Sequence, residues 1–190
     1  HAKYLLGEQD TEGARSALDR ALAIKPDYLE ALHARGGMHR LQGEHDDAVK
    51  IAKRLQQDHA GSTAGYLLES DVLLTQNKPE AALAVLKRAL PIAKNVDVAI
   101  MLNKIHQALG QSSEGVAVLR DWLQDHPEDV TAYFNLAVTH MAAGEQEEAI
   151  KAYEAILDIR PNVPAVMNDL AWLYSETGRP GALEMARNAH

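Results

Sequence analysis

The strongest constraint in this sequence is an interval of about 34 residues at which small side chains recur. Aligning the small residue that follows each turn signal gives five positions: Ala14, Ala48, Ala82, Gly115 and Ala149. Successive members are separated by 34, 34, 33 and 34 residues. A fixed period of this length is typical of repeat architectures, in which each repeat is one supersecondary unit. The chain is therefore expected to fold as an array of similar units.

Each repeat has the pattern of two helices joined by a short turn. Five residues before four of the small positions stands a turn-forming residue: Gly43, Asn77, Gly110 and Gly144. Gly and Asn tolerate the left-handed backbone conformation that ends many helices. Acidic residues follow the turn, as in GEQEEAI (144–150), where carboxylates complement the positive end of a helix. Three prolines stand twelve residues after small positions and are expected to end the second helix: Pro26, Pro127 and Pro161.

Two segments depart from the repeat. The turn expected over Gly7–Gly13 is longer than its counterparts, so the first unit is expected to turn differently. The segment KRALPIAKNVD (87–97) is one residue short and carries Pro91 where the second helix should still be running. A kink or an early stop of that helix is expected there.

Composition excludes several classes of function. The formal charge of −8 and the pI near 5.5 disfavour nucleic acid or an anionic membrane as the main partner. The chain has no Cys, which excludes disulfides, thiolate catalysis and cysteine-based zinc sites. No apolar run reaches the ~18 residues of a membrane span. The chain begins without Met inside a helical pattern and stops inside another, so we expect it to be a piece of a longer protein.

The pattern resembles the tetratricopeptide repeat (TPR). The residues of the unit 130–163 that match the family signature are Tyr133, Leu136, Ala137, His140, Gly144, Ala149, Tyr153, Ile156 and Pro161. The resemblance implies an all-α fold, a right-handed α-solenoid of stacked helix-turn-helix units. The expected units are a partial one at 1–28, full ones at 29–62, 63–96, 97–129 and 130–163, and a partial one at 164–190.

A narrower resemblance covers the last segment, Asn168–His190. It is similar to the C-terminal repeats of TPR lipoproteins linked to bacterial PEP-CTERM/exosortase exopolysaccharide systems. This resemblance implies a role in exopolysaccharide or protein export assembly. It favours a periplasmic or outer-membrane-anchored parent protein over a cytoplasmic one.

The TPR resemblance also implies an interaction surface. In the family the first helices line a concave face that contacts a peptide. Mapping that face onto this chain gives a candidate groove: Leu67, Asp71, Leu74, Met101, Lys104, Phe134, Asn135, Val138, Met141, Asp169 and Trp172. The apolar members favour an apolar peptide or an amphipathic helix as guest. Two alternatives stay open: segments of the parent protein fill the groove, or these side chains are core.

Nine histidines raise the question of a metal. His39, His106 and His140 occupy equivalent positions, where the family usually has an aromatic residue, and half-buried imidazoles are expected there. Neighbouring units would space them roughly 10 Å apart, the helix-packing distance. Zinc ligands lie near 2 Å from the ion, so no shared metal site is predicted. The acid pairs Asp46–Asp47 and Glu147–Glu148 are interpreted as helix starts.

The sequence therefore predicts a non-catalytic scaffold that binds protein or peptide partners, with no cofactor and no nucleic acid. Catalytic motifs such as G-x-S-x-G and H-E-x-x-H are absent. Two other hypotheses are retained. The chain could be the substrate-docking arm of a larger enzyme such as a glycosyltransferase. It could also be a structural spacer that self-associates through exposed terminal helices.

Overall fold

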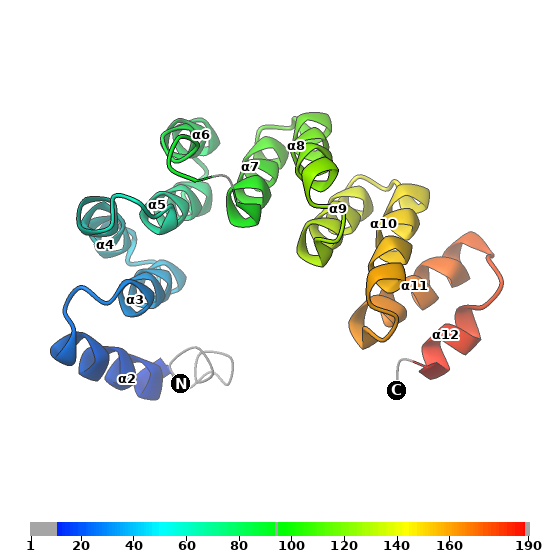
Figure 1. Cartoon of the computed structure of the whole chain (residues 1–190), viewed down its shortest axis with the longest axis horizontal. Coiled ribbons are helices and arrows are strands. Elements are labelled where there is room, and N and C mark those ends of the chain that lie inside the picture. The colour runs from blue at the N-terminus through cyan, green and yellow to red at the C-terminus, as the bar shows by residue number, and fades with distance from the viewer. Residues whose placement is uncertain (1–10, 94, 189–190) are drawn as a thin grey trace. The chain divides into compact units, whose positions relative to one another are not determined.

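The computed structural model describes residues 11–93 and 95–188, and every regular element within those ranges is an α-helix (Figure 1). The predicted all-α solenoid of helix-turn-helix units is confirmed. Contacts divide the chain into two compact units, residues 1–109 and residues 110–190.

Unit 1 contains six described helices. They are α2 (Thr11–Ile24), α3 (Leu29–Leu41), α4 (His45–Asp58), α5 (Ala64–Thr75), α6 (Pro79–Lys87) and α7 (Val96–Ala108). Each helix packs on the next along the chain, and α5 also touches both α3 and α7. The helices α3, α5 and α7 are the first helices of successive repeats. Their contacts therefore place the first helices side by side along unit 1.

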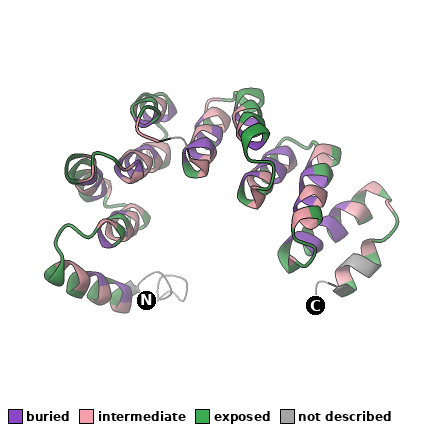
Figure 2. Ribbon diagram, in the orientation of Figure 1, coloured by how far each residue is buried: buried purple, intermediate pink, exposed green. Residues whose placement is uncertain are grey.

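Unit 2 contains five helices within the described residues. They are α8 (Ser112–Asp125), α9 (Val130–Ala142), α10 (Gln146–Ile159), α11 (Pro164–Thr177) and α12 (Ala182–Asn188). The α9–α10 hairpin is the most closely packed pair, and α8 and α11 flank it on either side. Buried residues lie on the helix faces that meet neighbouring helices (Figure 2).

The small residues that define the period are buried. Ala14, Ala48, Ala82 and Ala149 have no exposed surface, and Gly115 is also buried. A larger side chain at Ala48, Ala82 or Ala149 would hold the two packed helices of its repeat apart, because protein interiors have no spare volume. The periodicity in the sequence is thus a periodicity of helix–helix contact.

The turns have the left-handed backbone that the sequence predicts. The φ angles of Gly43, Gly110 and Gly144 are 77°, 73° and 74°. Asn77 takes the same role with φ of 57°, and it is the one non-glycine residue with positive φ among the described residues. Asn tolerates this conformation better than most residues with a Cβ. The chain therefore turns in the same way in all four repeats.

The predicted early stop of the second helix in the repeat 63–96 is confirmed. The helix α6 ends at Lys87 after nine residues, whereas α4, α8 and α10 each have 14. If α6 continued, the ring of Pro91 would collide with the carbonyl of Lys87 four residues earlier. Residues 88–92 form turns instead.

The long first turn expected over Gly7–Gly13 is wrong at its end, because Thr11–Gly13 are already helical in α2. Positions 7–10 lie outside the described residues. The two glycine positions suggested a loop, but Gly13 is followed by the buried Ala14, and packing of α2 on α3 extends the helix across it.

Three apolar clusters form the core of unit 1. One joins α3, α4 and α5 around Leu32 and Leu55, and a second joins α6 and α7 around Leu86, Met101 and Ile105. The third joins α2 and α3 around Leu18 and Met38. None of the helices that the structure describes combines the length and apolarity needed to span a bilayer.

Candidate protein-interaction surface

Unit 2 leaves three large apolar side chains in contact with solvent on its first helices. Phe134 and Val138 lie one turn apart on α9 and are 38% and 46% exposed. Trp172 lies on α11 and is 50% exposed. Exposed apolar groups that gather on neighbouring elements typically mark an interaction surface, whereas single ones need no explanation.

Tyr153 of α10 connects α9 to α11 beneath these groups. Its ring meets Phe134 edge to face, with centroids 6.0 Å apart and planes at 66°. Asp169 of α11 is its acidic neighbour, and burial followed by this carboxylate raises the pKa of Tyr153. The side chain of Tyr153 is only 3% exposed. It therefore lies next to the ring of Phe134 on α9 and near the carboxylate of Asp169 on α11.

We call Phe134, Asn135, Val138, Asp169 and Trp172 the α9–α11 surface. Asp169 is exposed and lies three residues before Trp172, so both emerge on the same side of α11. The side-chain amide of Asn135 donates to the carbonyl of Thr131 within α9, at 2.8 Å. Met141, three residues beyond Val138, is partly buried. The surface thus combines apolar groups with an exposed carboxylate.

The predicted groove residues of unit 1 are more buried. Leu67 and Leu74 of α5 are partly buried and pack against the core cluster of α6 and α7. Met101 is 8% exposed and belongs to that cluster, so the expectation that it lines a solvent-facing groove is corrected. Val98, Met101 and Ile105 follow helical spacing and form the core stripe of α7.

The polar groove residues of unit 1 differ in their surroundings. Asp71 of α5 forms an ion pair with Arg40 of α3, with Nε and Oδ2 2.8 Å apart. The Nε–H does not align for a hydrogen bond, so the contact is mainly electrostatic. Lys104 of α7 is exposed. Sequence reasoning placed Asp71 on the face but did not foresee that Arg40, one repeat earlier, would neutralise it.

Unit 1 also has a hollow between α2 and α3. It has a volume of about 600 Å³, and its walls include Leu18, Tyr28, Ala34, Gly37 and Leu41. Leu41 is 68% exposed and Tyr28 is 40% exposed. The sequence signal for this hollow is Gly37. Gly37 has no side chain and lies in the middle of α3, so it leaves space beside its larger neighbours.

Two histidines at equivalent positions bind the turn that follows them. His39 Nδ1 lies 2.5 Å from Glu44 Oε2, and His140 Nδ1 lies 2.5 Å from Glu145 Oε2. His39 is half-buried, as the sequence predicts, whereas His140 is only 3% exposed. Sequence reasoning compared these histidines with one another and missed the carboxylate five residues after each.

The carboxylates that follow these turns carry full charge in ion pairs. The hydrogen bond from Lys50 holds the pKa of Asp47 below its ordinary value. Lys151 does the same for the pKa of Glu148. Both carboxylates stand in the first turn of a helix, where their charge complements the helix N-terminus. This matches the interpretation of the acid pairs as helix starts.

Stacked antiparallel helical hairpins of about 34 residues, with small residues at each helix crossing, define this chain as an α-solenoid of the helical-repeat class. The family model for the tetratricopeptide repeat matches residues 1–64 and 101–164, about two thirds of the chain. The chain belongs to the tetratricopeptide repeat family, whose members act as protein-interaction scaffolds.

Two curated relatives illustrate the range of proteins with this repeat. The chain is 27% identical over 201 residues to the protein CTR9 homolog of Arabidopsis thaliana, which covers 98% of the chain but 18% of that protein. It is 32% identical over 69 residues to the photosystem I assembly protein Ycf3 of Cyanophora paradoxa, covering 34% of the chain and 40% of the relative. The chain thus spans less than half the length of either relative.

Solved structures share the fold at low sequence identity. The thermophilic TPR protein TTC0263 of Thermus thermophilus superposes with a TM-score of 0.77 at 20% identity, covering 92% of this chain and 95% of that one. MamA superposes with a TM-score of 0.61 at 19% identity, and the match covers 81% of this chain and 91% of MamA. YrrB, described as a TPR protein with an unusual peptide-binding site, superposes with a TM-score of 0.54 at 18% identity. The match covers 91% of this chain and 90% of YrrB.

Proposed function

We propose that this chain is a non-catalytic scaffold whose α9–α11 surface binds an apolar peptide or an amphipathic helix of a partner protein. The observation that carries the proposal is the exposure of Phe134, Val138 and Trp172 on first helices of adjacent repeats. A folded unit gains nothing from holding three such groups in water unless something covers them.

The polar groups of the surface suggest how a guest would be oriented. Asp169 is exposed near Tyr153 and can receive a basic side chain or a backbone amide of the guest. A guest helix would place apolar side chains at positions i, i+3 or i+4 and i+7 against Phe134, Val138 and Trp172. Aromatic anchors such as Trp172 commonly supply most of the binding energy at an interface.

Panning a random peptide library on the 190-residue chain tests this proposal. We expect enriched peptides to share apolar residues at helical spacing with a basic residue beside them. Trp172→Ala and Phe134→Ala should each weaken binding of these peptides by tenfold or more, which corresponds to about 1.4 kcal/mol. Isothermal titration calorimetry with synthetic peptides provides the affinities.

Leu41→Ala is the matched control, because Leu41 is likewise an exposed apolar residue, in unit 1. It should leave the affinity of these peptides unchanged. Peptides that bind Trp172→Ala and Phe134→Ala as tightly as the original chain would exclude the α9–α11 surface. Peptides lost only in Leu41→Ala would assign binding to the hollow between α2 and α3.

We further propose that the parent protein acts in exopolysaccharide or protein export assembly, on the periplasmic side of the cell envelope. The support is the resemblance of residues 168–190 to TPR lipoproteins of such systems. Affinity capture of the full-length protein from its own cells, with mass spectrometry, tests this. Recovery of export components is expected, whereas recovery of photosystem I subunits or of a covalently attached glycosyltransferase domain would contradict it.

A further inference from the structure

One short motif occurs twice in the chain with the same spacing. A histidine near the end of a first helix is followed by an acidic residue after five positions, another after eight and a lysine after eleven. The first copy is His39, Glu44, Asp47 and Lys50, and the second is His140, Glu145, Glu148 and Lys151. One copy lies in each unit, so the second copy serves as an internal control for the first.

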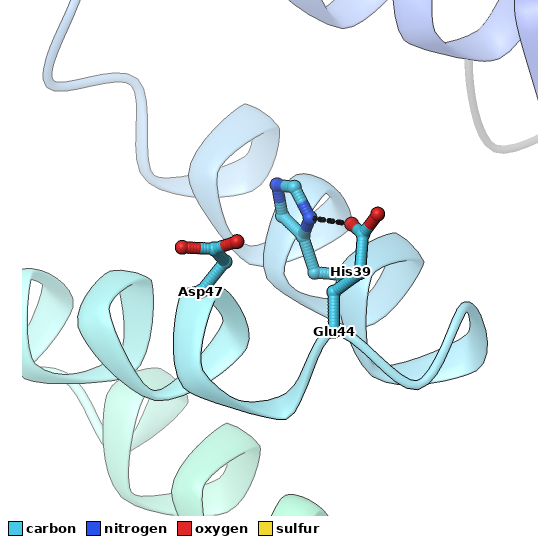
Figure 3. Close-up of side chains that lie close together, drawn as sticks. All are labelled: His39, Glu44 and Asp47. Carbon is cyan, nitrogen blue, oxygen red and sulfur yellow. Dashed lines mark hydrogen bonds and ion pairs between the residues drawn. The ribbon is translucent and has the colours of Figure 1, made fainter.

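In the first copy one imidazole and two carboxylates lie close together. One ring nitrogen of His39 and one carboxylate oxygen each from Glu44 and Asp47 all lie within 4.8 Å of one another. Figure 3 shows the imidazole of His39 between the two carboxyl groups, with its contact to Glu44 drawn as a dashed line. The three residues come from the end of α3, the turn and the first turn of α4.

We infer that His39, Glu44 and Asp47 form a binding site for a divalent transition-metal ion such as Zn²⁺. Imidazole nitrogen and carboxylate oxygen are ligands that Zn²⁺ accepts at about 2.0–2.2 Å. Three protein ligands leave coordination positions for water. This site goes beyond the proposed peptide surface, which lies in the other unit.

The spacing of the three groups suits a small ion. Ligand atoms around a tetrahedral Zn²⁺ are about 3.3 Å apart when each bond is about 2.0 Å. The contact of His39 with Glu44 is shorter, at 2.5 Å, and the whole group lies within 4.8 Å, so the required shifts are small side-chain rotations. Binding of the ion through Nδ1 would replace the hydrogen bond between His39 and Glu44 by two bonds to the metal.

Local charge and access also favour a cation. Glu44, Asp46 and Asp47 stand together, and Lys50 is the positive partner that pairs with Asp47 at 2.8 Å. Glu44 and Asp47 border an open hollow of about 360 Å³, through which an ion and its water ligands can enter. His45 lines the same hollow, and its Nδ1 has no hydrogen-bond partner among the described residues.

The second copy shows what prevents a site. Glu148 pairs with Lys151 at 2.6 Å and also faces Arg120 at 3.6 Å, so two cations compete for its carboxylate. His140 is 3% exposed, whereas His39 is partly open to solvent. Among the described residues only the first copy brings three ligand atoms within 4.8 Å. The His–Glu contact is therefore a shared feature, and the convergence of a third ligand is specific to unit 1.

Zn²⁺ titration of the metal-free 190-residue chain tests the inference by calorimetry. We expect His39→Gln and Asp47→Asn each to lower the Zn²⁺ association constant at least tenfold. His140→Gln, the matched control from the second copy, should change it less than twofold. Lys50→Ala frees Asp47 from its ion pair and should raise the association constant severalfold, a gain that unfolding cannot produce.

Asp47→Asn alters an exposed side chain, and circular dichroism would verify that it folds. Ring ¹⁵N shifts of the histidines provide a second readout, in which His39 should be the imidazole whose nitrogen signal moves on adding Zn²⁺. The inference fails if the original chain binds no Zn²⁺ at millimolar concentration. It also fails if His39→Gln and Asp47→Asn bind as tightly as the original chain, because other histidines would then hold the ion.

Discussion

Gly65 in α5 lies so close to Ala52 in α4 that a Cβ atom on it would stand 2.6 Å from the carbonyl oxygen of Ala52. The backbone nitrogen of Gln56 would be only 2.8 Å away. Both neighbours are backbone atoms of a packed helix and cannot rotate aside. The crossing of α4 and α5, which joins two successive repeats, thus depends on the absence of a side chain at one position.

Replacing Gly65 by Ala is therefore expected to destabilise unit 1 by about 1–3 kcal/mol, the usual cost of overfilling a packed site. Gly37→Ala is the control, because a Cβ there would meet nothing within 4 Å. Ala is a better helix former than Gly, so Gly37→Ala should stabilise the chain by about 0.5–1 kcal/mol. Urea unfolding of both variants measures the difference. Equal effects of the same sign would contradict the close contact at Gly65.

Met101→Ala and Val138→Ala should separate core from surface among the predicted groove residues. Met101 is buried, and its truncation is expected to cost about 2–5 kcal/mol. Val138 is 46% exposed, so its truncation should change stability by no more than about 0.5 kcal/mol. Thermal melts followed by circular dichroism give both values. A large loss for Val138→Ala would mean that the α9–α11 surface is part of the fold.

Asp129 is expected to matter because one carboxylate serves three donors. It accepts from the backbone nitrogens of Thr131 and Ala132 at 3.0 and 3.1 Å, and from Trp122 Nε1 at 2.8 Å. Asp129→Ala should destabilise unit 2 by about 1–3 kcal/mol through the lost helix cap and the indole left without its acceptor. Asp129→Asn keeps an oxygen acceptor and should lose less. Denaturant midpoints rank the variants, and an unchanged midpoint for Asp129→Ala would disprove the role.

Stability at high pH should depend on Tyr153. Burial raises the pKa of Tyr153 above the ordinary tyrosine value of 10.0, with Asp169 adding to the shift. Above that pH the unfolded chain loses the phenolic proton while the folded chain keeps it, so this group stabilises the fold below pH 10 and its contribution falls as pH rises further. Titration of Tyr153 can lower the free energy of unfolding by at most about 1.4 kcal/mol per pH unit.

Tyr153→Phe removes this titration and is the direct comparison. Its free energy of unfolding should decline less between about pH 9 and pH 11 than that of the original chain, because Phe has no phenolic proton to lose. Subtracting the two pH profiles cancels the remaining groups, among them Tyr174, whose pKa is also raised by burial. Parallel profiles would show that Tyr153 does not titrate differently in the folded state.

Pro91→Ala should lengthen α6. The helix stops at Lys87, and with Ala at position 91 the collision between the ring and the Lys87 carbonyl disappears. Up to about one further turn, roughly four residues, can then become helical. Far-ultraviolet circular dichroism should show a stronger helical signal and the melting temperature should rise. If neither changes, the turn at 88–92 is set by packing rather than by the proline.

The repeat could be predicted from the sequence because it rests on local chemistry. Small residues at the helix crossings and positive-φ turn residues such as Asn77 are signals that each lie within a few positions of their effect. The early end of α6 followed equally from one proline. These features require no knowledge of which helices meet in space.

The candidate site was harder to predict because exposure depends on neighbours in other repeats. Met101 and Trp172 are both large apolar residues on first helices, yet one is 8% and the other 50% exposed. Met101 lies on the face of α7 that packs into the core cluster with α6, whereas Trp172 lies on a face of α11 that stays exposed. Periodicity alone does not reveal which of these faces is covered. The ion pair of Arg40 with Asp71 likewise joins helices of two different repeats, which the periodicity alone does not predict.

The ion pair between Arg40 and Asp71 has a consequence for partner choice in unit 1. The Arg40 guanidinium and the Asp71 carboxylate are already paired at 2.8 Å between α3 and α5. An approaching polypeptide therefore meets a neutral ion pair there rather than a free charge. A lone basic side chain would have to displace the guanidinium, and a lone acidic one would have to displace the carboxylate. The face of unit 1 should therefore discriminate against segments of a single charge sign and admit neutral or zwitterionic ones.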